Sequence, residues 1–237
     1  MIVRYLVTNG LTGASLLVLL AYIIVILTAI VLHELSHGYV AYLNGDMTAK
    51  AQGRLTLNPL KHLTPIGTLL LFFVGFGFAR PVPIDPRNFR DYKKGMIATS
   101  LAGVTMNLFL ALINSICLAL VLKFGAWTYV GSMDASNYFT LFGYALFFYG
   151  MHVNILLMVF NLLPIYPLDG FRVVETLAEP DNKYVDFMYR NGRYVLLGFI
   201  LLMYLLSWLN IPDLFDMVQD LATMIFNAIW GGIGVGI

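Results

Sequence analysis

The chain has 237 residues, of which 59% are hydrophobic and 11% charged, and its mean hydropathy is +0.80. Soluble globular domains carry about 45–50% apolar and about 25% charged residues, and disordered chains are more polar still, so both classes are excluded. The net charge of +1 gives no basic field for nucleic acid. The single cysteine, Cys117, excludes an internal disulfide and a cysteine-based zinc cluster. The composition predicts a polytopic membrane protein.

Four apolar segments are predicted to cross the bilayer, because about 20 apolar residues span its hydrocarbon core as a helix. They cover residues 15–43, 95–122, 138–163 and, in a shorter form, 194–209. We expect no cleavable signal peptide, since the first apolar run continues without a small-residue cleavage site. The expectation is an all-α membrane protein whose single domain covers residues 1–237, with a core over residues 15–175.

Two further segments are predicted not to cross. Residues 66–79 are apolar but too few to span as a helix, and glycines and an Arg-Pro-Val-Pro sequence interrupt them. They favour a re-entrant loop or β-hairpin within residues 51–84, which a membrane tolerates only where its backbone is shielded. After Ile211, apolar residues recur at helical spacing with aspartates between them. This predicts an amphipathic helix, either at the interface or packed on the bundle.

The positions of Lys and Arg predict the orientation. Between the first two spans these residues are Lys50, Arg54, Lys61, Arg80, Arg87, Arg90, Lys93 and Lys94. Between the third and fourth spans they are Arg172, Lys183, Arg190 and Arg193. Between the second and third spans there is only Lys123. The positive-inside rule places the first two segments in the cytoplasm and the N-terminus outside. The protein is therefore expected in the cell membrane.

The sequence His33-Glu34-Leu35-Ser36-His37 is an HExxH motif near the inner end of the first span. Histidines four residues apart share a helix face, so both imidazoles can bind one metal ion, and Glu34 then lies beside it. Zinc suits imidazole ligands, and catalytic zinc sites keep three protein ligands plus a water. Polar caps near the membrane surface are the alternative interpretation, but three ionisable groups in one span indicate function.

Asp169 is the candidate third ligand. It follows the third predicted span in a segment punctuated by proline and glycine, which cannot be regular helix. If residues 66–79 do not cross, the inner end of the first span and the segment after the third lie on one side of the bilayer. The alternative role for Asp169 is a turn or helix-capping residue.

These motifs resemble the site-2 protease (M50) family of intramembrane zinc metalloproteases. The resemblance covers roughly residues 16–174 and includes HELSH, GRLTLNPLKHLTPIGTLLL, SLAGVTMNLFLAL and NLLPIYPLDG. It is closest to the compact prokaryotic branch that lacks PDZ and CBS domains. The chain departs from that branch at Thr64, Val104, Tyr166 and Phe171. Tyr166 and Phe171 flank Asp169, so their effect is expected on substrate selectivity.

The resemblance implies one zinc ion per chain held by His33, His37 and Asp169, with Glu34 as the general base. It implies that Asn161 hydrogen-bonds the substrate backbone. Segments like residues 51–84 are sheet-like in the family, so an extended substrate can add as a strand. The implied activity is hydrolysis of a peptide bond in or near the transmembrane segment of a membrane-protein substrate, in a water-filled cavity reached from the cytoplasm.

Two other functions stay open, a non-proteolytic membrane protein that binds or transports a divalent metal and a catalytically idle relative that acts as a scaffold. A transporter should carry ionisable residues near the bilayer midplane on several helices, whereas here these residues are predicted to converge on one site near the inner face, where Glu34 has no role in a simple set of ligands. Asn107, Asn114 and Asn154 are predicted to hydrogen-bond between helices, and a role of Asn107 or Asn154 in orienting the site or the substrate is the alternative. His152 is predicted to be a satisfied core residue and His62 to be exposed or at the membrane interface. The sequence does not indicate an oligomeric state.

Overall fold

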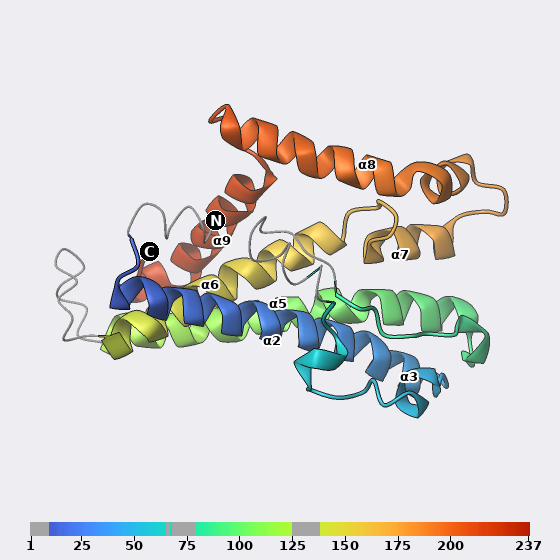
Figure 1. Cartoon of the computed structure of the whole chain (residues 1–237), viewed down its shortest axis with the longest axis horizontal. Coiled ribbons are helices and arrows are strands. Elements are labelled where there is room, and N and C mark those ends of the chain that lie inside the picture. Colours follow the sequence, from blue (N-terminus) through green and yellow to red (C-terminus); the bar gives the residue numbers. More distant parts are fainter. Residues whose placement is uncertain (1–9, 65–66, 68–78, 125–137) are drawn as a thin grey trace.

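The computed structural model describes residues 10–64, 67, 79–124 and 138–237. Its described elements are helical (Figure 1). The elements are α2 (Gly13–Leu43), α3 (Thr48–Ala51), η1 (Pro59–Lys61), η2 (Pro86–Asn88), α5 (Tyr92–Phe124), α6 (Tyr138–Asn161), α7 (Asp169–Leu177), α8 (Lys183–Trp208), α9 (Leu214–Trp230) and η4 (Gly231–Ile233).

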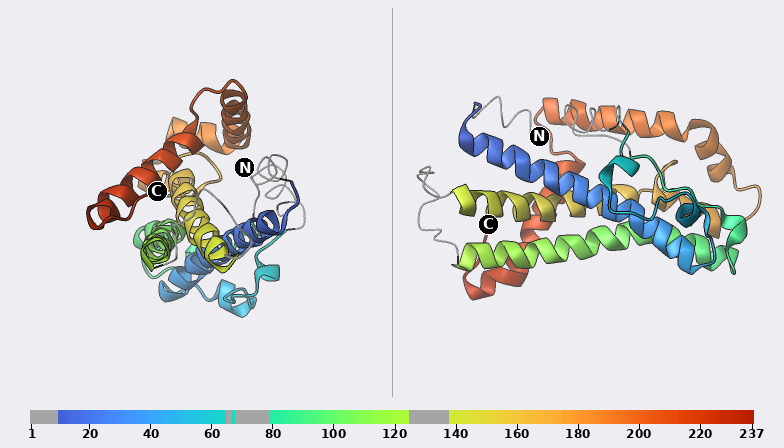
Figure 2. Two further views of the ribbon diagram at one scale, coloured as in Figure 1. Left: turned by 90° about the vertical axis from the view of Figure 1, so that its left-hand side faces the viewer. Right: turned by 60° about the horizontal axis from the view of Figure 1, so that its bottom comes forward.

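Helices α2, α5 and α6 lie side by side and form the bundle on which the site is built (Figures 1 and 2). They alternate in direction, so the end of α2 and the end of α6 lie at the same end of the bundle (Figure 1). Four helices, α2, α5, α6 and α8, are long and apolar enough to cross a bilayer. In its most apolar stretch α8 is only 11% buried, against 44% for α2. Helix α8 therefore packs least against the rest of the protein.

The predicted number and positions of these four helices are confirmed, with one difference in length. Helix α8 begins at Lys183, well before the predicted start at residue 194. The extra turns carry charged residues that interrupt the apolar pattern, so hydropathy does not detect them. Asn182 fixes the start, because its side chain accepts hydrogen bonds from the backbone N–H groups of Tyr184 and Val185.

The predicted C-terminal amphipathic helix is α9, and it packs on the bundle. Its buried face, Val218, Ala222 and Phe226, belongs to one hydrophobic cluster with residues of α5 and α6. Asp213 and Asp216 form a capping box at its start, so these aspartates end the loop and begin the helix. Of the two predicted locations for this helix, packing on the bundle is the one observed.

The predicted re-entrant loop or hairpin over residues 51–84 lies partly outside the described residues. In its described part there is no β-strand, and an isolated antiparallel bridge joins Leu63 to Ala79. The backbone N–H of Arg80 also donates to the carbonyl of His62, at 2.7 Å. Residues 62–63 are therefore held next to residues 79–80.

A loop lobe, formed by residues 44–63 and 79–91, packs at the end of α2. Its centre is Asp46, which is fully buried and accepts hydrogen bonds from the backbone N–H groups of Thr48 and Asp85 and from the Asn88 amide. His62 is also fully buried, and its Nε2 lies 2.8 Å from the carbonyl of Thr56. The prediction that His62 is exposed or interfacial was wrong, because the lobe folds around this side chain although the charged Lys61 directly precedes it.

Asp46→Asn is expected to lower stability by about 1–3 kcal/mol, because the new amide group places a donor against other buried donors. Burial raises the pKa of Asp46, but its hydrogen bonds lower it by more, so the folded-state pKa lies below the ordinary value. The carboxylate then stabilises the fold above about pH 4, and this contribution is lost as pH falls through the folded-state pKa. Thermal melting in detergent between pH 2 and pH 7.5 measures both effects.

Asp220→Asn is the matched control for this comparison, because Asp220 lies exposed on α9. It should melt like the wild type throughout. A melting temperature of Asp46→Asn equal to that of wild type at neutral pH would show that the buried carboxylate does not organise the loop lobe.

Candidate metal centre

His33, His37 and Asp169 meet at the end of the bundle. The Nε2 atoms of the two histidines are 3.0 Å apart, and each lies 3.2 Å from Oδ2 of Asp169. Both histidines are buried, with 8% and 7% of their surface exposed. Within the described residues, this is the group of His, Cys, Asp or Glu side chains with ligand atoms close enough together to hold a metal ion.

Two helices and one loop bring these side chains together. The histidines lie one turn apart on α2, as the HExxH spacing predicts, and Asp169 is the first residue of α7. The loop from α6 returns closely on itself at Gly170, where a Cβ atom would lie 2.2 Å from the carbonyl oxygen of Leu162. Only glycine fits there. The contact holds Gly170, and with it the neighbouring Asp169, against the end of α6.

Each histidine is oriented through its other ring nitrogen. Nδ1 of His37 lies 2.7 Å from the backbone carbonyl of Thr99, which can only accept a hydrogen bond. Nδ1 of His37 must therefore be the donor. In the neutral ring, this leaves Nε2 with an unshared electron pair directed at His33 and Asp169.

A line of two amides fixes His33 in the same way. Nδ1 of His33 lies 2.5 Å from Oδ1 of Asn107, whose Nδ2 donates to Oδ1 of Asn154 at 2.8 Å. Nδ2 of Asn154 then donates to the carbonyl of Gly150, which can only accept. The direction of every bond in this line follows from that carbonyl. Nδ1 of His33 is consequently a donor, and its Nε2 is free to bind a metal.

Three atoms with unshared pairs therefore converge within 3.2 Å of one another. One of these atoms is Oδ2 of the Asp169 carboxylate. This buried atom has no hydrogen-bond partner. A cation or added protons must lie among such atoms. A tetrahedral zinc ion, bonded at about 2.0–2.2 Å, holds its ligand atoms roughly 3.3 Å apart, so the set fits zinc.

Glu34 completes the centre on the same helix. Its Oε2 accepts a hydrogen bond of 3.1 Å from the backbone N–H of Val82, in the loop lobe. A segment distant in sequence thus holds the Glu34 carboxylate, which is not part of the group formed by His33, His37 and Asp169.

Comparisons with known proteins agree with this chemistry. The family model described as "Peptidase family M50" matches residues 130–205. "Putative zinc metalloprotease YwhC" of Bacillus subtilis is 42% identical over 159 residues, which cover 67% of this chain and 69% of that protein. The chain belongs to peptidase family M50.

Further relatives are similar to this M50 peptidase. "Putative zinc metalloprotease Rip2" of Mycolicibacterium smegmatis is 31% identical over 162 residues, covering 66% of this chain and 57% of that protein. Its namesake in Mycobacterium tuberculosis H37Rv is 27% identical over 190 residues, covering 78% of this chain and 66% of that protein. No solved structure gives a significant match. The family resemblance expected from the motifs is confirmed.

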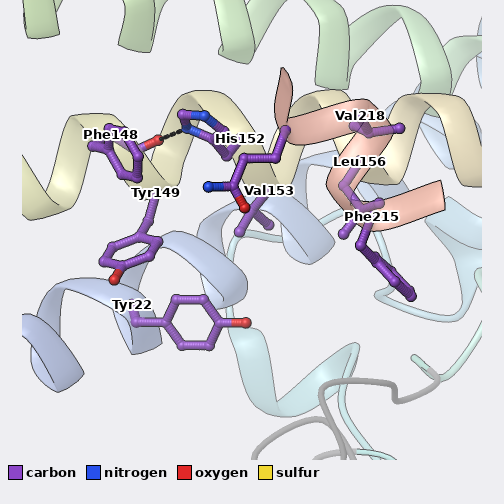
Figure 3. Close-up of a pocket in the computed structure, with 9 residues that line it drawn as sticks. Tyr22, Phe148, Tyr149, His152, Val153, Leu156, Phe215 and Val218 are labelled. Atoms are coloured by element: carbon purple, nitrogen blue, oxygen red, sulfur yellow. Dashed lines mark hydrogen bonds between the residues drawn. The ribbon is translucent and has the colours of Figure 1, made fainter. Parts of the chain in front are cut away.

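Two other predicted polar residues, Asn161 and His152, hydrogen-bond to the backbone of their own helix, α6. The side chain of Asn161 turns back on α6 and donates to the carbonyl of Leu157, so its contact with substrate stays a prediction. Nδ1 of His152 lies 2.8 Å from the carbonyl of Phe148, and His152 lines a cavity of about 250 Å³ between α2, α6 and α9 (Figure 3). His152 is the satisfied core residue that was predicted.

Gly103 is a residue of the site in this M50 peptidase that sequence reasoning did not identify. It lies on α5, where a Cβ atom would be 2.5 Å from both Cε1 of His33 and Nε2 of His37. The absence of a side chain lets the α5 backbone pack directly on the imidazoles. Its position was the available signal in the sequence. Gly103 lies one helical turn before Asn107, so the two residues share a face of an otherwise ordinary apolar helix.

Gly103→Ala is expected to weaken zinc binding about 10–100-fold, because the added methyl group pushes both imidazoles off their positions. The helix itself should persist, since alanine is the better helix former. Chelator competition in detergent measures the affinity, and circular dichroism reports the helix content. Gly198→Ala, at a helical glycine with no neighbour within 4 Å of the added Cβ, is the control. Equal zinc affinity in all three proteins would contradict the close packing of α5 on the histidines.

Proposed function

We propose that this M50 peptidase is an intramembrane zinc endopeptidase. In this proposal His33, His37 and Asp169 hold one zinc ion per chain and Glu34 is the general base. The substrate is a membrane-spanning protein, and the bond that is cut lies in or near its transmembrane segment. The convergence of three unshared electron pairs beside Glu34 carries the proposal, because this arrangement suits a metal ion and leaves a carboxylate free for proton transfer.

The chemistry follows the zinc peptidase pattern. A bound zinc ion would polarise the scissile carbonyl and lower the pKa of a water molecule. Glu34 accepts a proton from the attacking water and passes it to the leaving amine. Asn107 and Thr99 keep the two imidazoles in the tautomers that direct Nε2 inward. Asn161 is proposed to hydrogen-bond the substrate backbone as the peptide lies across the site.

The substrate must enter as an extended chain, because a peptide bond inside a helix is shielded and hydrogen-bonded. We propose that part of residues 51–84 offers a strand edge to which the unwound substrate adds. The antiparallel bridge between Leu63 and Ala79 supports this, since it brings two extended segments together close in sequence to Val82, which contacts Glu34.

The proposed orientation places the site near the cytoplasmic face, with access for water from that side. The charge distribution supports this, as does the location of the loop lobe and α7 at one end of the bundle (Figure 1). In a Cys117→Ser background, a cysteine introduced at exposed Lys123 should react with an impermeant maleimide in intact cells. A cysteine at exposed Lys93 should react only after permeabilisation. The reverse labelling pattern would overturn the orientation.

The catalytic assignment is tested with purified protein and a panel of labelled single-span substrates. Glu34→Gln should lower cleavage about 10²–10⁴-fold, the usual contribution of a general base, and should retain zinc. His37→Ala and Asp169→Asn should lose most of the bound zinc, because each removes or weakens a ligand.

Each other outcome selects a different conclusion. A wild-type protein that holds no zinc would contradict the ligand assignment. A wild type that holds zinc but cuts none of the substrates would favour the non-proteolytic metal-binding or transport alternative. Cleavage that survives Glu34→Gln would exclude Glu34 as the base.

A further inference from the structure

The segment Arg80-Pro81-Val82-Pro83 contacts Glu34 through a single N–H group. Proline has no backbone N–H, so Val82 is the only residue among 81–83 that can donate from the backbone. That one donor lies 3.1 Å from Oε2 of Glu34. The position of this short segment therefore decides whether the Glu34 carboxylate has its partner.

Arg54 also binds this segment, through two backbone carbonyls. Its Nη2 donates to the carbonyl of Arg80 at 2.8 Å and to the carbonyl of Pro81 at 3.2 Å. The guanidinium is buried, with 7% of the residue exposed, and in the described part of the chain it has no carboxylate partner within salt-bridge distance. Both contacts go to the peptide groups directly before Val82, so Arg54 fixes the segment next to the N–H that Glu34 uses.

Side-chain packing also holds the segment that contains Val82. A Cβ atom at Gly38 of α2 would lie 2.8 Å from Cγ1 of Val82 and 2.7 Å from Cδ2 of Leu55. Val82 thus lies directly on the α2 backbone, one turn after Glu34, and Leu55, the neighbour of Arg54, packs beside it. Leu55 and Val82 therefore connect the loop lobe to the helix that carries the HExxH motif, and Arg54 joins the two parts of the lobe to which they belong.

We propose that Arg54 is a positioning residue for Glu34, acting through the carbonyls of Arg80 and Pro81 and the N–H of Val82. The proposal rests on the proposed function for the role of Glu34 as the base. Arg54 does not touch the ligand atoms of His33, His37 or Asp169. Its loss should therefore misplace the carboxylate and leave the metal ligands in position.

A planar guanidinium can hold two neighbouring carbonyls in a fixed geometry, whereas a lysine ammonium is a flexible point donor. Arg54→Lys should consequently restore only part of the function that Arg54→Met removes. Lys61→Met, at an exposed cation of the same lobe, is the matched control.

The first experiment does not depend on activity. Hydrogen–deuterium exchange at the Val82 amide is measured in wild type, Arg54→Met, Arg54→Lys, Glu34→Ala and Lys61→Met, from peptides covering residues 79–84. Exchange should be about 5- to 10-fold faster in Arg54→Met and Glu34→Ala, as expected for the loss of one hydrogen bond, and unchanged in Lys61→Met. Wild-type exchange in Arg54→Met, or in Glu34→Ala, would overturn the proposal.

The second experiment distinguishes positioning from a general structural role. Arg54→Met should lower kcat about 10–100-fold with little change in KM, bound zinc or melting temperature. In a Glu34→Asp background, whose shorter side chain cannot reach Val82, the same substitution should have no further effect on kcat. Additive losses in that background, or loss of zinc in Arg54→Met, would overturn the positioning role. Failure of the wild type to cleave would count against the proposed function, and the exchange data would still test Arg54.

Discussion

Polar atoms buried within the membrane must find partners, because hydrocarbon offers none, and the site of this protein is organised by that requirement. The Nδ1 atom of each histidine meets this requirement by donating a hydrogen bond, and the bonds that start there end at backbone carbonyls, which can only accept. Thr99 accepts from His37 directly, and Gly150 ends the line that begins at His33. In the neutral rings, these carbonyls leave each Nε2 without a proton, facing Asp169. The electron pairs available to a metal are therefore set by backbone atoms of α5 and α6.

The same requirement explains why three helices must pack closely here. The amide line runs from α2 through Asn107 of α5 to Asn154 of α6, so it forms only when all three helices are in register. Small residues permit such close approach between membrane helices, and Gly103 does so at the histidines. Folding of the bundle and preorganisation of the site are consequently one event, since neither the amide line nor the Gly103 contact exists in a separated helix.

Local patterns predicted the parts of this structure that depend on residue type and spacing. The HExxH spacing, the apolar spans and the proline and glycine residues around Asp169 are such patterns. The number of membrane crossings between them then predicted that Asp169 lies on the same side of the bilayer as His33 and His37. Contacts between distant segments carry no local pattern. Burial of His62, the approach of Gly103 to the imidazoles and the clamp by Arg54 all depend on how the loop lobe and α5 pack. The charged start of α8 was missed because hydropathy detects apolar residues, not helix caps.

Asp169 differs from the two histidines in how it is held, and this difference has a structural source. The histidines belong to α2, inside the bundle, whereas Asp169 follows a loop that packs against α8. The rings of Tyr166, Phe171 and Tyr189 contact one another, with centroids 5.3–5.5 Å apart, and Phe171 is fully buried.

Aromatic pairs of this kind contribute about 0.5–1.5 kcal/mol each beyond the area they bury. Gly192 of α8 also lies directly against Tyr166. The third candidate ligand is thus tied to the long helix that packs least on the bundle, while the other two are tied to its centre. Tyr166 and Phe171, where the chain departs from the compact branch it resembles, are the residues that form this connection. A substitution at either residue is therefore expected to alter how α8 is joined to the candidate metal centre and to leave the ligand atoms themselves in place.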